Sequence, residues 1–276
     1  MLLEVDALAC TLTHVRQSKP VVHTITNWVT AGDVANGLHA IGARPIMAIA
    51  LEEVEDIIYR ADALVLNLGT PDPSRIKAML LAGHCANSLG RPVIFDPVGA
   101  AASKFRMEAI RNILSELSIT TIRGNRAEIG ALTEMGGELR GIDAARGPAD
   151  LHGAAKLLSQ KTGAAVVLSG PQDLVVRDEK MVIVENGHPM MGQVTGTGCM
   201  LSAIIGAFAA VEKDPMAAAV AAAAFFGLAG ERAAQQANGP GTFRAALLDA
   251  LYALKPDDLE AGARIKSPLP PFSKGG

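Results

Sequence analysis

Ala-Leu-Val-Leu-Asn at residues 63–67 and Pro-Val-Ile-Phe-Asp at residues 92–96 flank a longer stretch over residues 73–89. Each flanking run is short and apolar, a pattern that favours a buried strand. The stretch between them carries apolar side chains at helical spacing, namely Ile76, Met79 and Leu80. One apolar stripe of this kind is typical of a helix that packs on a sheet. The unit therefore predicts two parallel strands joined by a helical crossover.

The same alternation extends along most of the chain. Strands are predicted at 20–24, 44–48, 63–67, 92–96, 119–122 and 164–169. Helices are predicted between them at 30–41, 52–61, 73–89, 104–116, 125–135 and 144–161. A hairpin at 173–176 and 181–185 follows, and then helices at 198–211, 214–236 and 242–254. This order predicts an α/β fold with a mostly parallel central sheet and helices on both faces.

Length and charge exclude several classes of protein. At about 150 residues per domain, 276 residues suggest one or two domains, and because no linker divides the chain we expect one domain over 1–265 and a tail over 266–276. The 25 Lys and Arg against 28 Asp and Glu give a net charge of −3. Without a basic cluster, nucleic acid is not an expected partner.

The chain is 49% hydrophobic, with a mean hydropathy of +0.26, so a membrane span must be considered. The apolar stretches 199–211 and 216–230 are separated by residues 212–215, and each is shorter than the roughly 18 residues of a spanning helix. They are interpreted as core helices. No basic region precedes an apolar one at the start, and the three cysteines are scattered, which favours a reducing cytoplasm.

Four junctions lie where strands end or an apolar helix starts: 23–27, 95–99, 123–128 and 194–199. Ligands of open α/β sheets bind at the carboxyl ends of the strands, so these junctions are the candidate site. In the last junction, Gly196 and Gly198 allow a sharp turn into a helix whose free amides would hold an anion. The alternative is a glycine-rich turn before a core helix, and Leu201 excludes a dinucleotide fingerprint.

Two acidic residues are candidate magnesium ligands. Asp96 ends a strand, and Glu128 lies in the first turn of a predicted helix facing the same cleft, where both would hold Mg²⁺ through water. Each has a structural alternative: Asp96 as a turn cap, and Glu128 with Asn125 as a capping box. Arg123 is either a phosphate ligand or a solvated surface arginine.

Three further residues have competing interpretations. Cys199 occupies the first turn of a helix, whose dipole would lower the pKa of its thiol, or it is a small buried hydrophobe. No histidine pattern supports a Cys–His hydrolase. His23 is interpreted as a structural residue at a strand end, and Trp28 as a core anchor or, alternatively, a wall of the substrate pocket.

Taken together, the chain resembles the hydroxyethylthiazole kinases of the ribokinase-like superfamily over about residues 5–254. The resemblance lies in seven motifs in the right order: Val-His-Thr-Ile-Thr-Asn at 22–27, Pro-Ile-Met-Ala at 45–48, Leu-Asn-Leu-Gly-Thr at 66–70, Asp-Pro-Val-Gly-Ala at 96–100, Ile-Arg-Gly-Asn-Arg-Ala-Glu-Ile at 122–129, Val-Thr-Gly-Thr-Gly-Cys at 194–199 and Gly-Pro-Gly-Thr-Phe at 239–243. It implies a three-layer ribokinase-like sandwich. It also implies transfer of the ATP γ-phosphate to the hydroxyl of 4-methyl-5-(2-hydroxyethyl)thiazole, a thiamine salvage step.

The resemblance also implies roles for individual residues. Cys199 stands where the superfamily usually has its catalytic Asp, and the amides of Gly196 and Gly198 would stabilise the moving phosphoryl group. The implied ligands are Arg123, Ser169 and Asn125 for ATP, Asp96 and Glu128 for Mg²⁺, and Asn27, Met47, Gly69, Thr70 and Gly196 for the thiazole. Gly69 and Thr70 would come from a neighbouring subunit, because the family implies a homotrimer with sites at its interfaces.

Three departures from the family pattern and two rival functions stay open. Trp28 stands where the family often has Asn, the family often has a different run at Ala31-Gly-Asp33, and Ser169 replaces a common Thr but keeps the hydroxyl. One rival is another vitamin-precursor kinase or an ATP-dependent dehydratase, against which Cys199 in place of Asp argues. The other is a nucleotide-binding regulator without turnover, against which the intact anion cradle and carboxylates argue.

Overall fold

A nine-stranded sheet forms the centre of the computed structural model, which describes residues 5–134 and 151–267. Its spatial order is β2-β1-β3-β4-β5-β6-β7-β8-β9. The strands are β1 (Val21–Ile25), β2 (Arg44–Ile46), β3 (Ala63–Asn67), β4 (Val93–Asp96), β5 (Thr121–Asn125), β6 (Ala165–Ser169), β7 (Asp173–Arg177), β8 (Lys180–Val184) and β9 (Ile265–Lys266). The pairs from β2 to β6 are parallel, and those from β6 to β9 are antiparallel.

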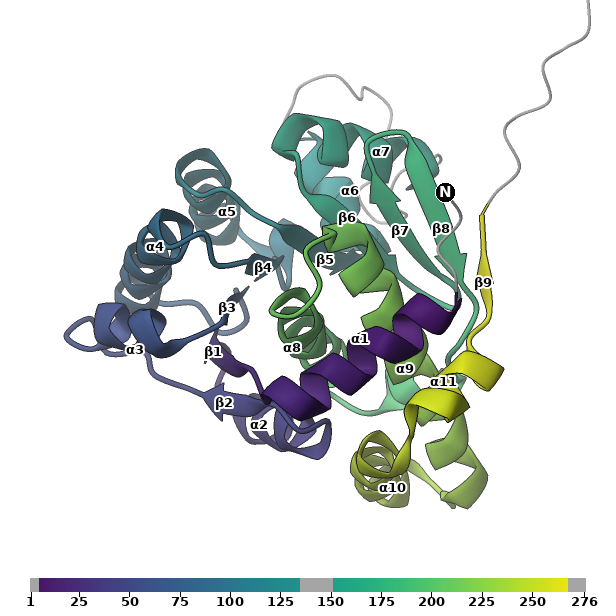
Figure 1. Ribbon diagram of the computed structural model, residues 1–276. Coiled ribbons are helices and arrows are strands. Elements are labelled where there is room, and N and C mark those ends of the chain that lie inside the picture. The colour runs from purple at the N-terminus through teal and green to yellow at the C-terminus, as the bar shows by residue number, and fades with distance from the viewer. Residues whose placement is uncertain (1–4, 135–150, 268–276) are drawn as a thin grey trace, which may run out of the picture.

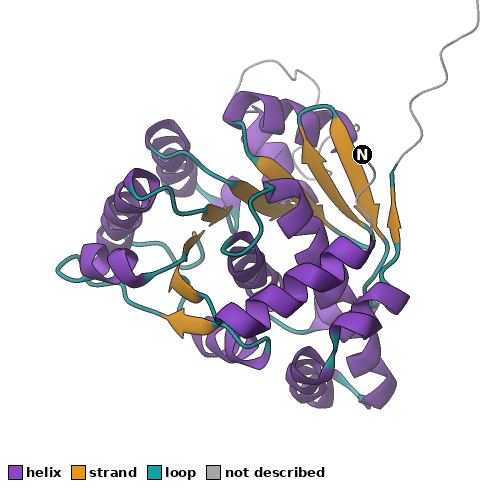
Figure 2. Ribbon diagram, viewed as in Figure 1, coloured by secondary structure: helices purple, strands orange, loops and turns teal. Residues whose placement is uncertain are grey.

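Helices cover both faces of this sheet (Figures 1 and 2). They are α1 (Val5–Ser18), α2 (Ala31–Ala40), α3 (Val54–Arg60), α4 (Pro73–Ser88), α5 (Lys104–Glu116), α6 (Arg126–Glu134), α7 (Leu151–Thr162), α8 (Thr197–Ala209), α9 (Pro215–Gln236), α10 (Pro240–Ala253) and α11 (Pro256–Gly262). Along β3, Leu64 and Leu66 belong to the apolar core that also contains residues of α3 to α7, whereas Val65 belongs to the core that contains residues of α1, α2 and α8 to α10. Alternate side chains thus enter two separate cores, which confirms the predicted three-layer α/β fold.

Helix α9 contradicts part of the membrane argument. It has 22 residues and a mean hydropathy of 1.3 over its most apolar window, so it is long and apolar enough to cross a membrane. The apolar run counted in the sequence was shorter because the helix continues through Glu231 and Arg232 to Gln236. However, 83% of that window is buried inside the protein, as expected for a core helix.

Most predicted elements are confirmed, with ends shifted by a few residues. Helix α1, helix α11 and strand β9 were not predicted. The predicted helix over 144–161 is observed as α7, and its first part lies outside the described residues. Lys266 belongs to β9, so its assignment to the tail is wrong. The rest of the predicted tail, over 268–276, lies outside the described residues.

Candidate active site

The carboxylate of Asp96 lies at the centre of the candidate site. Strands β3 and β4 are neighbours, and their register places Asn67 directly beside Asp96 at the carboxyl ends. Asn67 Nδ2 donates a hydrogen bond of 2.8 Å to Asp96 Oδ2, and Ser202 Oγ from α8 donates one of 2.7 Å to the same oxygen. The Arg123 Nη1 atom lies 3.9 Å from it. Both α8 and the sheet therefore fix the position of this side chain.

The second oxygen of Asp96 is different. Oδ1 is buried and accepts no hydrogen bond from any described residue. Burial raises the pKa of Asp96 to about 6; Arg123 opposes this rise, and the nearby Glu128 carboxylate adds to it. Such a buried, unpaired carboxylate oxygen is suited to a cation.

Glu128 combines a structural contact with a place beside Asp96. Asn125 Oδ1 accepts from the amides of Ala127 and Glu128, and Glu128 Oε2 accepts from the amide of Asn125 at 2.8 Å, so the capping box is confirmed. Glu128 Oε1 also accepts from the amide of Gly99 at 3.0 Å. Since both oxygens already have amide partners, this carboxylate fits a cation held through water.

No group of three or more His, Cys, Asp or Glu side chains gathers into a metal site in the described ranges. Asp96 and Glu128 are thus a pair of carboxylates without a third protein ligand. Mg²⁺ usually keeps several waters and takes one or two carboxylates together with substrate phosphates. The pair fits that mode of binding.

Helix α8 packs against β1, β3 and β4, and its N-terminus lies near the carboxyl ends of these strands. Gly196 has φ of +97°, and a Cβ there would come within 2.7 Å of Thr30 Cγ2, so only glycine fits. A Cβ at Gly198 would clash with the Arg123 guanidinium. The first-turn amides of α8 therefore lie beside an arginine, and together they attract an anion.

Cys199 lies in this first turn, but its acidity differs from the prediction. Asn27 Nδ2 donates a hydrogen bond of 3.4 Å to Cys199 Sγ and one of 3.0 Å to Asn67 Oδ1. Burial raises the pKa of the Cys199 thiol, and the Asp96 carboxylate raises it further. The expectation of a lowered pKa is wrong, because desolvation and the neighbouring Asp96 carboxylate both raise the pKa of this thiol.

Asn27 and two other predicted thiazole ligands, Gly69 and Thr70, lie close together. Asn27 Oδ1 accepts from Thr30 Oγ1 and from the Val29 and Thr30 amides, which fixes the turn after β1. A Cβ at Gly69 would clash with Asn27, and Thr70 Oγ1 accepts from the Trp28 amide. Asn27, Gly69 and Thr70 therefore form one surface beside Cys199.

The structure supports the interpretation of His23 but not that of Trp28. His23 is buried, and its Nε2 lies 2.8 Å from the carbonyl of Ala48, next to the half-buried Met47, which supports its structural role. Trp28 is not a core anchor: 65% of it is exposed, and its ring stacks 4.5 Å from the guanidinium of Arg75. The core prediction is wrong because Trp28 lies in the turn between β1 and α2, which holds its side chain at the surface. The size and hydrophobicity of a tryptophan side chain do not reveal this position.

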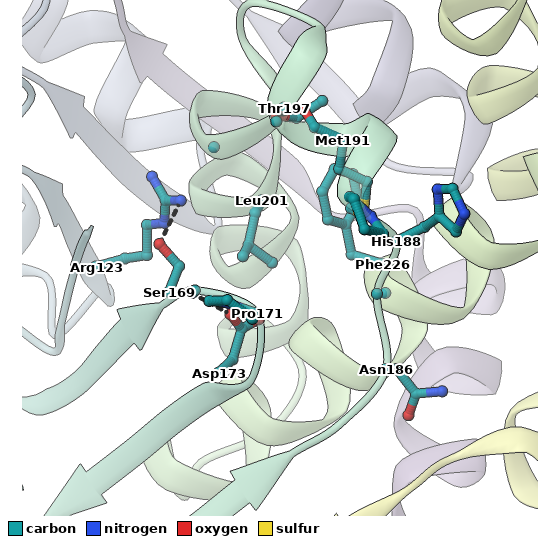
Figure 3. Close-up of a pocket in the computed structure, with 16 residues that line it drawn as sticks. Arg123, Ser169, Pro171, Asp173, Asn186, His188, Met191, Thr197, Leu201 and Phe226 are labelled. Atoms are coloured by element: carbon teal, nitrogen blue, oxygen red, sulfur yellow. Dashed lines mark hydrogen bonds between the residues drawn. The ribbon is translucent and has the colours of Figure 1, made fainter. Parts of the chain in front are cut away.

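A cavity of about 410 Å³ opens beside the α8 N-terminus (Figure 3). At one end Arg123 Nη2 donates a hydrogen bond of 2.6 Å to Ser169 Oγ, and Gly198 lies next to them. At the other end lie Asn186 and His188. Asn125 does not line this cavity, because it is engaged in the helix cap.

Several residues of the site were not predicted from the sequence. They are Asn67, Ser202, Thr30, Asp173, Asn186 and Phe226. Asn67 could have been found, because it ends a buried strand as Asp96 does. Ser202 lies three residues after Cys199 and so shares its helix face. Thr30 lies three residues after Asn27 and donates a hydrogen bond to it, but no local pattern distinguishes Thr30. Asp173, Asn186 and Phe226 line the cavity together with residues that are distant in the sequence.

Comparison with known proteins places the chain in a family. Residues 12–257 match the model of the hydroxyethylthiazole kinase family. The chain belongs to this family. A hydroxyethylthiazole kinase from Thermoanaerobacter pseudethanolicus is 47% identical over 253 residues, covering 91% of this chain and 96% of the relative. One from Methanocella arvoryzae is 44% identical and covers 96% of this chain and 99% of the relative.

Solved structures agree with this assignment. The hydroxyethylthiazole kinase of Pyrococcus horikoshii has a TM-score of 0.86 and 39% identity, covering 94% of this chain and 98% of that one. A pyridoxal kinase from Staphylococcus aureus, at 18% identity and a TM-score of 0.59, shares the fold alone. The predicted family, ribokinase-like fold and enzyme class, a phosphotransferase of thiamine salvage, are confirmed.

Proposed function

We propose that this kinase transfers the γ-phosphate of ATP to the primary hydroxyl of 4-methyl-5-(2-hydroxyethyl)thiazole. One observation carries the proposal. The cavity ends at the amides of α8, next to Arg123, while Cys199 and Asn27 lie at the same helix end. A phosphate chain in the cavity would thus end where a small alcohol beside Cys199 could meet it.

Phosphoryl transfer needs positioning and charge neutralisation more than covalent help. Arg123 and Ser169 are placed to hold the ATP phosphates, since their hydrogen-bonded pair lies at one end of the cavity. The amides of Gly196, Gly198 and Cys199 would stabilise charge on the moving group. Asn125 has its side chain in the cap of α6, so it supports the fold of this loop.

Asp96 and Glu128 are the residues that would hold Mg²⁺. When bound, Mg²⁺ neutralises phosphate charge. The unpaired Oδ1 of Asp96 would face it, and Glu128 would act through water. Asn67 and Ser202 hold Asp96 in place by its other oxygen.

The thiol of Cys199 is neutral near pH 7, because burial and Asp96 raise its pKa. We therefore assign it the positioning of the substrate alcohol, with acceptance of the proton late in the reaction. Met47 and Gly196 complete the thiazole pocket with Asn27. The polarizable thioether of Met47 suits a flat sulfur heterocycle.

The enzyme is proposed to work in the cytoplasm as a homotrimer. Trp28 and Val29 are 65% and 67% exposed and lie beside the Gly69–Thr70 segment. Apolar side chains so exposed next to a site fit a subunit interface. Because Gly69 and Thr70 lie against Asn27 and Trp28 of their own chain, they would border both the pocket of their own subunit and this interface. Sedimentation would test this assembly.

The reaction is tested by measuring ADP formation with Mg²⁺-ATP, with and without the thiazole, and by determining the mass of the product by mass spectrometry. Thiazole-dependent turnover and a product heavier by one phosphoryl group would support the proposal. Turnover of other alcohols alone would favour a different vitamin-precursor kinase. Turnover with dehydration of the substrate would favour a dehydratase, and ATP binding without any turnover a regulator.

A further inference from the structure

Helix α9 packs backbone to backbone on the loop that closes the far end of the cavity. A Cβ at Gly227 would clash with the carbonyl oxygen of Asn186, and one at Gly230 would clash with Sδ of Met191. Asn186, Met191 and Gly227 all line the cavity. The loop over 186–191 is therefore shaped by its contact with this helix.

One turn after Gly227, Glu231 fixes the main chain of the same loop. Its Oε1 accepts a hydrogen bond of 2.7 Å from the amide of Gly187 and one of 3.3 Å from Nδ2 of Asn186. Gly187 has φ of +147°, a conformation that L side chains rarely adopt. The carboxylate thus holds the loop in one unusual backbone conformation.

Arg264 in turn holds Glu231. Its Nη1 donates 3.0 Å to Glu231 Oε2 and its Nη2 donates 2.6 Å to Glu231 Oε1, a bidentate pair. The Arg264 amide donates to Asn186 Oδ1 at 2.7 Å, and its carbonyl accepts from the Glu185 amide at 2.8 Å. The segment leading into β9 is therefore tied to α9 and to the cavity loop at once.

This network lies at the end of the cavity away from the phosphate ligands. Figure 3 shows Asn186 and His188 on the side opposite Arg123 and Ser169. Phe226 and Met191 also line the cavity there, and apolar side chains of this kind suit a flat heterocyclic base.

We propose that Glu231 and Arg264 are positioning residues for the base end of the nucleotide cavity, acting through the loop over 186–191. The inference rests on the proposed function, which makes this cavity the ATP site. Arg264 lies beyond residue 257, where the family match ends. The C-terminal segment of this chain thus becomes part of the nucleotide site without touching the nucleotide.

The arginine–carboxylate pair alone would add little to stability, because half of the Arg264 side chain is exposed. Its expected effect is on nucleotide affinity. Loss of Glu231 frees the Gly187 amide, and loss of Arg264 removes the bidentate pair that holds the Glu231 carboxylate. Either change widens the range of loop conformations, so ATP binding must first restore the right one.

The test measures kcat and both KM values for Glu231→Ala, Arg264→Ala and the matched control Arg232→Ala. Arg232 is the next residue on α9, and its Nη2 pairs with Asp258 at 2.7 Å, away from the loop. The KM for ATP is expected to rise about fivefold to tenfold in the first two variants. The kcat should stay within about twofold, and the KM for the thiazole should not change.

Glu231→Gln should restore part of the ATP affinity, because it keeps an acceptor for the Gly187 amide. An ATP KM in Glu231→Ala no higher than in Arg232→Ala would overturn the inference, and so would a loss confined to kcat. Absence of thiazole turnover in the parent protein would instead reject the proposed function. Calorimetric titration with ADP then decides the inference. A weaker Kd for ADP in Glu231→Ala and Arg264→Ala than in Arg232→Ala supports it, and equal Kd values in the three variants refute it.

Discussion

The side-chain amide of Asn67 donates a 2.8 Å hydrogen bond to Oδ2 of Asp96, the same oxygen that accepts from Ser202. Both donors thus reach one side of the carboxylate and leave Oδ1 unpaired within the described structure. A cap or turn residue would use its oxygens on backbone amides, as Glu128 does. The arrangement around Asp96 instead preserves one oxygen for a cation.

Replacing Asp96 with Asn should lower kcat by about 10²- to 10³-fold, because the charge that would hold Mg²⁺ is lost while the side-chain shape is kept. The measurement is steady-state turnover across a range of Mg²⁺ concentrations. Ser202→Ala is the control, since it removes a donor to Oδ2 but no charge, and it should cost far less. A full-rate Asp96→Asn variant would contradict the assignment.

Replacing Arg123 with Gln should raise the KM for ATP about tenfold or more, because a charged donor at the phosphate end of the cavity is removed. The thiazole KM should change little. Arg177→Gln is the matched control: Arg177 forms a surface pair with Asp214 at 3.0 Å and does not line the cavity. Equal ATP KM values in the two variants would show that Arg123 does not bind phosphate.

The sequence predicts those helices and strands whose apolar pattern is local, and misses those that form only by contact with distant segments. The strand over 63–67 and the helix over 104–116 are predicted with their observed ends, because their apolar patterns are local and strong. Strand β9 has two residues and exists only because it pairs with β8, which no local pattern reveals. Helix α11 has seven residues, too few for a clear periodicity.

The site residues also fall into those that local sequence predicts and those that depend on distant contacts. Asp96 and the glycines before α8 follow from their place after a strand or before a helix. The pKa of Cys199 does not, because it depends on burial under a turn from β1 and on a carboxylate from β4. Helix position alone predicted the opposite direction. Contacts between distant segments therefore set the direction of the pKa shift at this thiol.

Asp96 should make stability depend on pH in a specific direction. Its pKa is raised in the folded protein to about 6 from an ordinary value of 3.8, so the folded state binds the proton more tightly. Its contribution to stability is present below pH 3.8 and is lost as the pH rises through about 6. Between pH 4 and 8 the free energy of unfolding of Asp96→Asn should therefore gain about 2 kcal/mol relative to the parent.

Urea unfolding of both proteins at several pH values, without Mg²⁺, measures this difference. A constant difference between parent and Asp96→Asn across this range would mean that the carboxyl titrates as it does in water.

The Cys199 thiol should react slowly with iodoacetamide near neutral pH, because only the thiolate is nucleophilic and the pKa is raised. Its alkylation rate should still climb about tenfold per pH unit up to pH 9. Peptide mass mapping separates Cys199 from the exposed Cys10 and the buried Cys85. A rate for Cys199 that levels off below pH 8 would indicate a thiolate and an activated base.

If the neutral thiol only positions the alcohol and takes its proton late, a carboxylate at the same place can do the same work. Cys199→Asp should therefore stay active, whereas Cys199→Ala should lose about tenfold in kcat, because no acceptor then faces the hydroxyl. The KM for ATP should be unchanged in both, which a collapsed helix end would not allow. A Cys199→Ala enzyme that bound both substrates normally and turned over at the parental rate would remove the thiol from the mechanism. Proton transfer would then depend on Asp96 or on the substrate phosphate, and the acid limb of the pH–rate profile would separate those two.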